Sequence, residues 1–272
     1  MTLEHIYNTQ SYIQEHYNQP LSIARLEQLS FYSYRNLQRI FKSVYGETIG
    51  AYQSRLKCDH AFKKILFSQM PISDIALEVG YADLQALRKA FKKRYGFPPS
   101  EARNNRKTLL AEDLPAIELR PPPNPDIVHL ATQNIYYLSK QTAYETRAID
   151  ELWDELLAYE FAEELSHYYG ILNDEPLITD DIHCRYDAAV TQADTGQQLP
   201  TKELRGGAYA RFQHQGSYDD IENTYDVIFR DWILQTELEI SSEPIIEQYV
   251  VTEEHTDDPN EYLTYILIPL VQ

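Results

Sequence analysis

The chain has 272 residues and a net charge of −18 at pH 7, with 42 Asp and Glu residues against 24 Lys and Arg residues. This length is enough to bury two hydrophobic cores, and the negative charge argues against a chain that binds nucleic acid over its whole surface. No apolar run approaches 18 residues and no secretory amino-terminal region is visible, so we expect a soluble, cytoplasmic protein with no membrane partner.

Residue types that commonly bind metals or act in catalysis are scattered along the chain. Cys58 and Cys184 are the two cysteines, and the eight histidines form no H-x-x-x-H or Cys/His cluster. No Ser/His/Asp or Cys/His arrangement is apparent either. We therefore predict no metal, no cofactor and no catalytic residues.

The charge is divided unevenly along the chain. Residues 1–110 contain 16 Lys and Arg against 9 Asp and Glu, a net charge of +7, whereas residues 111–272 contain 8 against 33, a net charge of −25. This asymmetry predicts two domains with these boundaries and with different partners. The basic domain is suited to DNA and the acidic domain is not.

Helical patterns fill the basic domain. Residues 3–16 are predicted to form an opening helix. Residues 22–46 read SIARLEQLS, then the turn FYS, then YRNLQRIFKSVYG, and a short helix, a tight turn and a second helix are typical of a helix-turn-helix. Residues 48–68 contain no proline and predict one connecting helix, about 32 Å long at 1.5 Å per residue.

A second unit of this kind occupies residues 71–102. Apolar residues at the i, i+3, i+4, i+7 spacing of a helix open it: Ile72, Ile75, Ala76 and Val79. Gly80 provides the turn, Asp83 caps the second helix, and Gly96 followed by two prolines ends it. The inward side of that helix is predicted to hold Leu87, Ala90 and Phe91, and the outward side Gln85, Arg88, Lys89, Lys92 and Lys93.

The two units are copies of each other. Five residues of the first recur 50 positions later: Leu37, Phe41, Lys42, Tyr45 and Gly46 as Leu87, Phe91, Lys92, Tyr95 and Gly96. A fixed offset indicates an internal repeat. The connecting helix has a length close to one turn of B-DNA, about 34 Å, so the second helices of both units are predicted to enter successive major grooves from one side.

The segments LQRIFKSVYG, DIALEVGYAD and AFKKRYGFPPSEAR resemble the paired helix-turn-helix domain of AraC/XylS-type transcription regulators, over residues 3–107. The resemblance implies that bases are read from six positions: Arg35, Gln38, Arg39, Leu84, Gln85 and Lys89. Arg and Lys suit guanine and Gln suits adenine, whereas Leu84 offers only contact with a thymine methyl. Phosphate contacts are assigned to Arg88, Lys92, Lys93, Arg94 and Lys42.

The acidic domain shows mixed patterns. Strand, helix, strand, strand are predicted over residues 135–138, 148–166, 168–172 and 183–190, and again over 208–214, 221–236, 244–251 and 263–269. The fold class is therefore multidomain, an all-α double helix-turn-helix followed by an α+β domain of two duplicated halves with a groove between them.

GGAYARFQHQGSYDDIENTYDVIFRDWI, PIIEQYVV and LTYILIPL resemble the GyrI-like small-molecule-binding domain, over residues 112–272. The resemblance implies a groove of aromatic residues around a buried glutamate, matched by Glu247, that holds lipophilic cations. A cation would pair the carboxylate, and aromatic faces would add attraction. The ligand-binding candidates are Glu247, Tyr249, Tyr265, Trp232, Tyr209 and Trp153.

These patterns indicate a transcription regulator that is not an enzyme. We expect it to bind double-stranded DNA through its first domain, to sense a lipophilic or cationic effector in its second, and to contact RNA polymerase. Two alternatives remain for the second domain. It could be a hydrolase with Glu247 as general base, or a protein-interaction module without a ligand.

Overall fold

The computed structural model describes residues 3–111, 124–144, 147–159, 167–176, 178–191 and 199–271. The chain divides into two compact units, residues 1–104 and 105–272. The helices of the first unit are α1 (Leu3–Glu15), α2 (Ile23–Ser30), α3 (Tyr34–Tyr45), α4 (Ile49–Phe67), α5 (Ile72–Glu78), α6 (Leu84–Tyr95) and α7 (Pro99–Asn104). All of the predicted helices of this unit are present.

The repeat predicted at an offset of 50 is visible in three dimensions. Helices α3 and α6 each contain 12 residues, and each ends at a glycine in the left-handed conformation, Gly46 with φ 75° and Gly96 with φ 87°. The turn between α2 and α3 differs, because Phe31 takes a left-handed φ of 57° there without being a glycine. Four apolar residues of the repeat are completely buried: Leu37, Phe41, Leu87 and Phe91.

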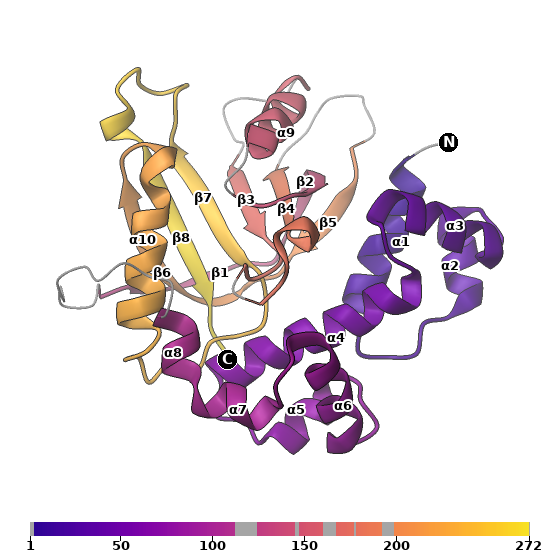
Figure 1. The fold of residues 1–272 in the computed structure, drawn as a ribbon. Helices are drawn as coiled ribbons and strands as arrows, with labels where there is room; N and C mark the ends of the chain where they lie inside the picture. The colour runs from indigo at the N-terminus through magenta and orange to yellow at the C-terminus, as the bar shows by residue number, and fades with distance from the viewer. Residues whose placement is uncertain are drawn as a thin grey trace. The chain divides into compact units, whose positions relative to one another are not determined.

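Helix α4 joins the two copies, as predicted, and Figure 1 shows it running between α1–α3 and α5–α7. Its 19 residues span about 28 Å at 1.5 Å per residue. Near its start, Tyr52 and Leu56 belong to the apolar cluster of the first copy. Near its end, Phe62 packs edge-on against Phe91 of the second copy. Helix α4 is therefore part of both apolar cores.

The second unit begins with a short helix, α8 (Arg106–Ala111). It also contains the helices α9 (Arg147–Leu157) and α10 (Ile221–Val227), with single 3-10 turns at Asp181–His183, Tyr218–Asp220 and Pro259–Glu261. Its strands are β1 (Asp126–Leu130), β2 (Gln133–Gln141), β3 (Tyr168–Leu172), β4 (Arg185–Val190), β5 (Thr201–Leu204), β6 (Gly207–Gln215), β7 (Ile245–Val251) and β8 (Leu263–Pro269).

Among the described residues, the strands form one sheet in the order β1-β6-β8-β7-β3-β4-β2-β5, with antiparallel neighbours throughout. The predicted halves are β2-α9-β3-β4 and β6-α10-β7-β8, which meet at β3 and β7. The order is the same when the halves are exchanged, so an approximate twofold axis passes between β3 and β7. Strands β1 and β5 were not predicted. β1 precedes the first half in the chain but pairs with β6 of the second half, and β5 precedes the second half but pairs with β2 of the first.

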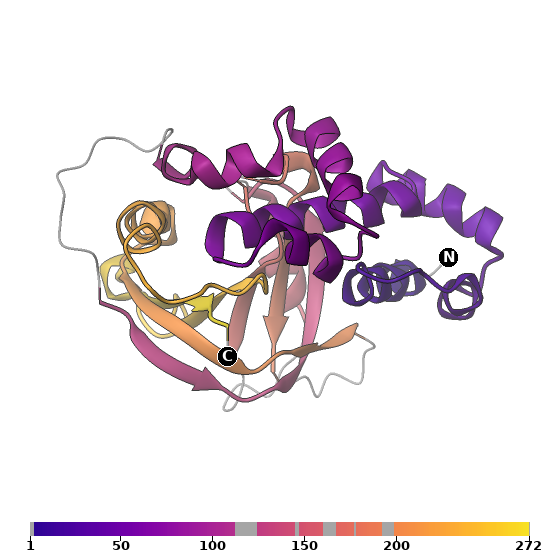
Figure 2. The ribbon, with the colours of Figure 1, turned by 90° about the horizontal axis from the view of Figure 1, so that it is seen from below.

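The two faces of this sheet differ. One face holds an apolar cluster to which all the strands contribute, including Tyr137, Tyr169, Ile246 and Leu267. Figure 2 shows the curl of the sheet. Helices α9 and α10 lie on the other face, because Trp153 of α9 and Tyr225 of α10 contact strand residues there. Three of the candidate ligand residues, Glu247, Tyr249 and Trp153, lie on this helical face.

Two predicted helices are shorter than expected. Helix α9 ends at Leu157, although the pattern predicted a helix to residue 166, and residues 160–166 lie outside the described part of the chain. The predicted helix 221–236 is regular only to Val227 and continues as a π-helical turn, Ile228–Trp232, in which the Ile233 amide donates to the Ile228 carbonyl at 2.9 Å. Across the described ranges, no helix is both long and apolar enough to cross a bilayer.

Candidate functional sites

The outward side of α3 carries cationic side chains. Arg35, Arg39 and Lys42 are exposed. The Arg39 guanidinium donates to the side-chain oxygen of Asn36 at 3.0 Å, one turn earlier on the same helix. Their exposure leaves these cations accessible to a groove or to phosphates.

Gln38 has an intramolecular role on α3. Its side chain is half-buried, and its amide nitrogen donates to the Tyr34 hydroxyl at 2.6 Å. Its amide oxygen accepts from the backbone N–H of Ile49 at 3.4 Å, at the first residue of α4. A contact between Gln38 and adenine would have to replace these two hydrogen bonds.

Helix α6 presents a row of polar and basic side chains. The exposed residues on it are Gln85, Arg88, Lys89, Lys92 and Lys93. Leu84, the first residue of the helix, is half-buried. Arg94 does not belong to this row, because its Nε donates to Asp59 Oδ1 at 2.9 Å. The structure therefore assigns Arg94 to packing α6 against α4, whereas the sequence predicted a phosphate contact.

The amino termini of the two recognition helices are held by carboxylates. Asp83 Oδ1 accepts from the Ala86 amide of α6 at 2.7 Å, as predicted. At α3 this role falls to Glu27 of α2, whose Oε1 accepts from the Tyr34 amide at 2.7 Å. The Glu27 contact was not predicted, because it joins two helices and leaves no local capping pattern. Both bonds hold the first turn of their helix in place.

Glu247 of β7 lies at the centre of the second unit and is only 7% exposed. The Tyr225 hydroxyl donates to its Oε1 at 2.8 Å, and the Tyr249 hydroxyl donates to its Oε2 at 2.6 Å. The Tyr186 hydroxyl lies 2.8 Å from that of Tyr249 and accepts from Trp153 Nε1 at 3.1 Å. We call these five residues the Glu247 cluster. They come from β7, α10, β4 and α9, so both halves of the domain contribute.

Burial determines the electrostatics of this cluster. It raises the pKa of Glu247, and the hydrogen bonds from Tyr249 and Tyr225 oppose that rise. Burial and the nearby Glu247 charge hold the pKa values of Tyr186, Tyr225 and Tyr249 well above their ordinary value, so these hydroxyls stay protonated donors. Within the described residues, no Lys or Arg forms an ion pair with Glu247.

Aromatic rings surround the hydroxyls. The rings of Trp153 and Tyr249 meet edge to face at 5.3 Å, and those of Tyr218 and Tyr249 do so at 5.5 Å. Gly170 of β3 lies opposite Glu247 in the sheet register. A Cβ there would lie 2.1 Å from the Tyr186 hydroxyl and 2.9 Å from Glu247 Oε2, so this glycine makes the space in which the polar groups meet.

Three of the predicted ligand residues lie elsewhere. Tyr265 pairs with Gln248 across β7 and β8, so it is on the opposite face from Glu247, where the Arg211 guanidinium lies 4.6 Å from its ring centre. Tyr209 is in the apolar cluster of that same face, and its hydroxyl donates to the Arg205 carbonyl at 2.9 Å. The expectation that these tyrosines share a groove with Glu247 is therefore wrong, since strand register places them behind the sheet.

Trp232 is likewise a core residue. It is buried on the helical face of the sheet and packs edge-on against Phe212 of β6, with ring centres 4.9 Å apart. Of the predicted set, the structure thus brings Glu247, Tyr249 and Trp153 together. It adds Tyr186 and Tyr225, which the sequence analysis placed on a strand and a helix without a functional role.

The described residues hold no group of three or more His, Cys, Asp or Glu side chains that could bind a metal ion. The two helical copies, α1–α3 and α5–α7, are joined by α4 and carry exposed cations on α3 and α6. Together they form a DNA-reading module. Attached to a duplicated α+β domain with a polar cluster between its helices, this module defines a one-component transcription regulator.

Comparison with known proteins agrees with this class. The family of GyrI-like small molecule binding domains matches residues 123–271, and a helix-turn-helix domain family matches residues 28–105. Transcriptional regulator Rob of Salmonella typhimurium is 23% identical over 281 residues, which cover 95% of each chain. Regulatory protein SoxS of Escherichia coli K12 is 33% identical over 94 residues, 35% of this chain and 88% of SoxS. The chain belongs to the GyrI-like family and carries an AraC-type helix-turn-helix domain; it is a DNA-binding transcription regulator that senses small molecules.

Proposed function

We propose that the Glu247 cluster is the effector site and that its effector is a small lipophilic cation. The observation that carries this proposal is a buried carboxylate, hydrogen-bonded by neutral tyrosine hydroxyls, with no ion pair to Lys or Arg within the described residues. Burying a charge is unfavourable unless it is paired. An arriving cation supplies the missing charge, and Trp153 and the tyrosines offer ring faces worth about 0.5–2 kcal/mol each.

A binding role for Glu247 accounts for its surroundings better than a catalytic one. Both carboxylate oxygens already accept a tyrosine hydrogen bond, at 2.8 and 2.6 Å. A general base must lie within hydrogen-bonding reach of the proton that it removes. We therefore assign Glu247 to ligand recognition and regard the protein as a regulator without enzymatic activity.

The test compares two probes of nearly the same shape. Phenyltrimethylammonium is a cation and tert-butylbenzene is its neutral isostere. We expect the cation, and not the isostere, to raise the melting temperature of the full chain, because a ligand that binds only the folded state at 100 times its Kd adds about 2.7 kcal/mol. Glu247→Gln keeps the shape of the side chain and should abolish the shift. No stabilisation by either probe would favour a ligand-free interaction module, and turnover of an ester that Glu247→Gln abolishes would favour the hydrolase.

For DNA, we propose that bases are read by the exposed side chains of Arg35, Arg39, Gln85 and Lys89 on α3 and α6, and that the half-buried Gln38 and Leu84 contribute less. Phosphate contacts fall to Arg88, Lys92 and Lys93. RNA polymerase is a further partner, and the cytoplasm is the compartment in which the protein acts. Selection of bound duplexes from genomic DNA by the purified chain identifies the binding site. On that site Arg39→Ala should cost about 1–3 kcal/mol relative to random DNA, whereas Lys93→Ala should weaken both alike.

A further inference from the structure

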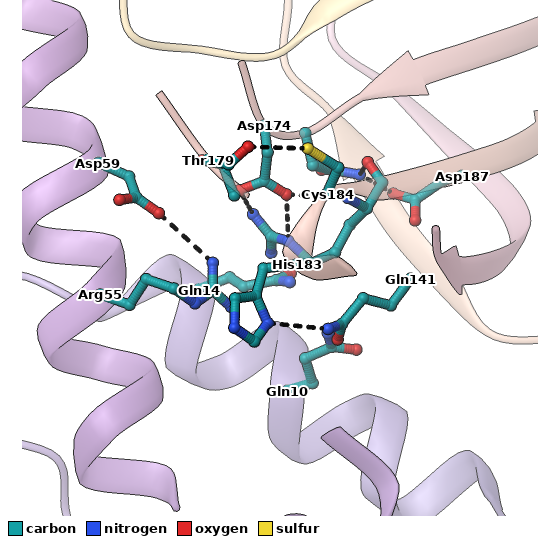
Figure 3. A network of polar contacts seen from close by, with 12 residues as sticks. Gln10, Gln14, Arg55, Asp59, Gln141, Asp174, Thr179, His183, Cys184 and Asp187 are labelled. Atoms are coloured by element: carbon teal, nitrogen blue, oxygen red, sulfur yellow. Dashed lines mark hydrogen bonds and ion pairs between the residues drawn. The ribbon is translucent and has the colours of Figure 1, made fainter. Parts of the chain in front are cut away.

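A chain of charges, buried at Arg55 and Asp59 and half-buried at its two ends, runs through the middle of α4. Asp59 is 6% exposed, and its Oδ1 accepts from Arg94 Nε at 2.9 Å and from the Tyr95 hydroxyl at 2.6 Å. Its Oδ2 pairs with Arg55 at 3.4 Å, an interaction drawn in Figure 3. Arg55, itself 4% exposed, pairs with Glu47 at 2.8 Å. We call Glu47, Arg55, Asp59 and Arg94 the α4 charge chain.

The two ends of this chain lie near the carboxyl ends of α3 and α6. Glu47 directly follows Gly46, the residue that ends α3, and Arg94 with Tyr95 forms the last turn of α6. The α4 charge chain therefore connects the carboxyl ends of the two recognition helices. Its formal charges alternate and sum to zero, so each buried ion has an oppositely charged neighbour.

A second contact joins the copies at a different place. The loop between α1 and α2 lies against the turn of the second helix-turn-helix, where a Cβ on Gly80 would be 1.9 Å from the backbone oxygen of Asn18. The Asn18 side chain donates to the Glu78 carbonyl at 3.2 Å. Gln53 of α4 holds the loop by donating to the carbonyls of Tyr17 and Gln19 at 2.9 and 2.6 Å.

Position 80 thus requires a glycine for two reasons. Its φ is 83°, which a glycine adopts without strain, and the Asn18 backbone leaves no room for a side chain. Lys57 of α4 also donates to the Gly80 carbonyl at 2.8 Å. The turn of the second copy is therefore held by contacts with both the first copy and helix α4.

The two contacts restrict the relative movement of the two copies more than helix α4 does alone. A helix in two apolar cores sets a distance, but apolar packing tolerates rotation and sliding better than directional charged hydrogen bonds do. The charge chain acts at the ends of the recognition helices, and the Asn18–Gly80 contact acts at a turn. Together they remove the rotation of one copy about the other.

We infer that Asp59 is a positioning residue for DNA binding, which fixes the recognition helices at the spacing and angle that let both enter the duplex at once. Two linked modules bind tightly only when the geometry lets both engage, and the gain is lost when it does not. Loss of the Asp59 charge should therefore weaken binding to a complete site far more than binding to half of it.

The experiment uses the full chain and three duplexes, namely the site recovered by selection, the same site with one half scrambled, and the same site with one base pair inserted between the halves. Kd is measured for each by fluorescence anisotropy at one salt concentration. For Asp59→Asn we expect a loss of tenfold or more on the complete site, a change below twofold on the scrambled site, and a smaller penalty for the insertion than in the unmodified chain.

Asp74→Asn is the matched control, because Asp74 is exposed on the first turn of α5 and its loss changes the net charge equally. It should leave the insertion penalty as it is. Equal losses for Asp59→Asn on complete and scrambled sites, with the insertion penalty intact, would show a purely structural role and overturn the inference. If Asp59→Asn does not fold, Tyr95→Phe removes the hydroxyl that donates to Asp59 at 2.6 Å without changing any charge, and an unchanged insertion penalty in that variant also overturns the inference.

Discussion

Gly170 and Glu247 face each other on the central strands of the second domain and occupy equivalent places in its two halves. The register pairs them directly across β3 and β7, where the approximate twofold axis passes. One half therefore supplies the carboxylate and the other supplies the space beside it. The two paired positions carry different residues, so the site is asymmetric although the two halves are alike.

Gly170→Ala tests whether the effector site depends on the space that this glycine leaves beside Glu247. The new methyl group would lie 2.1 Å from the Tyr186 hydroxyl, and Tyr186 is 2% exposed and has little freedom to move away. We expect a destabilisation of about 1–3 kcal/mol from overpacking, together with at least a tenfold loss of affinity for phenyltrimethylammonium by calorimetry. Binding of DNA should be unchanged.

A double-mutant cycle with Tyr186→Phe serves as the control, because it removes the hydroxyl that the methyl group meets. The stability lost in Gly170→Ala should be partly recovered in the double variant. Strict additivity of the two changes would mean that the methyl group acts somewhere other than at Tyr186.

The raised pKa of Glu247 gives the effector site a dependence on pH. Burial is the main cause of the rise above the ordinary value of 4.5. The ionised form binds a cation, so affinity for phenyltrimethylammonium should increase as the pH rises through the raised pKa, by up to about tenfold per pH unit below it. Without ligand, the folded chain binds more protons than the unfolded chain between pH 4.5 and the raised pKa. The free energy of unfolding should therefore fall as the pH rises across that window.

Glu247→Gln cannot titrate and should lose both trends. Calorimetric titrations at a series of pH values measure the first, and thermal unfolding in the same buffers measures the second. A cation affinity that is flat with pH in the unmodified chain would place the charge that binds the cation elsewhere.

Sequence alone locates part of this site and misplaces the rest for a definable reason. The resemblance of PIIEQYVV to a known family indicated Glu247, and Tyr249, two residues later, lies on the same face of β7 because side chains alternate along a strand. Alternation within one strand does not tell which face the neighbouring strand presents, so Tyr265 was assigned to the wrong side. The pairing of Tyr265 with Gln248 is set by the register of β7 and β8, a non-local property. Tyr186 and Tyr225 depend on the same long-range geometry.

The recognition helices allow a comparison between two copies of one element. Asp83 accepts a hydrogen bond from the Ala86 amide at 2.7 Å, whereas Ser33, 50 positions earlier, makes no side-chain cap. Replacing a bonded cap with Ala costs about 0.5–2 kcal/mol, typically near 1. Asp83→Ala should therefore destabilise the start of α6, and Ser33→Ala should leave α3 almost unchanged.

Hydrogen exchange followed by mass spectrometry measures the effect on each helix separately. A loss of about 1 kcal/mol corresponds to roughly fivefold faster exchange for amides that open locally. Equal acceleration in α3 and α6 for Asp83→Ala would indicate unfolding of the whole domain and would contradict a local role for the cap.

Element by element, the helical domain was more predictable than the sheet domain. The repeat and its glycines marked α2, α3, α5 and α6 to within a few residues, because helix signals are local. Strands β1 and β5 were missed, since they have only 5 and 4 residues and the pattern of burial along β1 does not alternate regularly. The π-helical turn after α10 was also invisible, because an apolar spacing fits either helical form over so short a stretch.

At the scale of the whole molecule, the division of charge has a consequence for DNA binding. Residues 1–104 carry 14 Lys and Arg against 9 Asp and Glu, and residues 105–272 carry 10 against 33. The two units are joined by Asn105 alone between α7 and α8. A domain with a net charge of −23 is thus tethered to one of +5, and its field repels the phosphates that the first domain attracts.

Removal of residues 105–272 should therefore strengthen binding to random-sequence DNA at low salt. The remaining unit has its own apolar core, to which Ile6, Leu37 and Tyr52 belong. The difference in Kd between residues 1–104 and the full chain should be largest near 10 mM salt, where the Debye length is about 30 Å, and should shrink near 150 mM, where it is about 8 Å. Adding residues 105–272 as a separate chain at equal concentration should not restore the weaker binding, because the repulsion depends on tethering. Equal affinities of the short and full chains at every salt concentration would show that the acidic domain has no influence on the encounter with DNA.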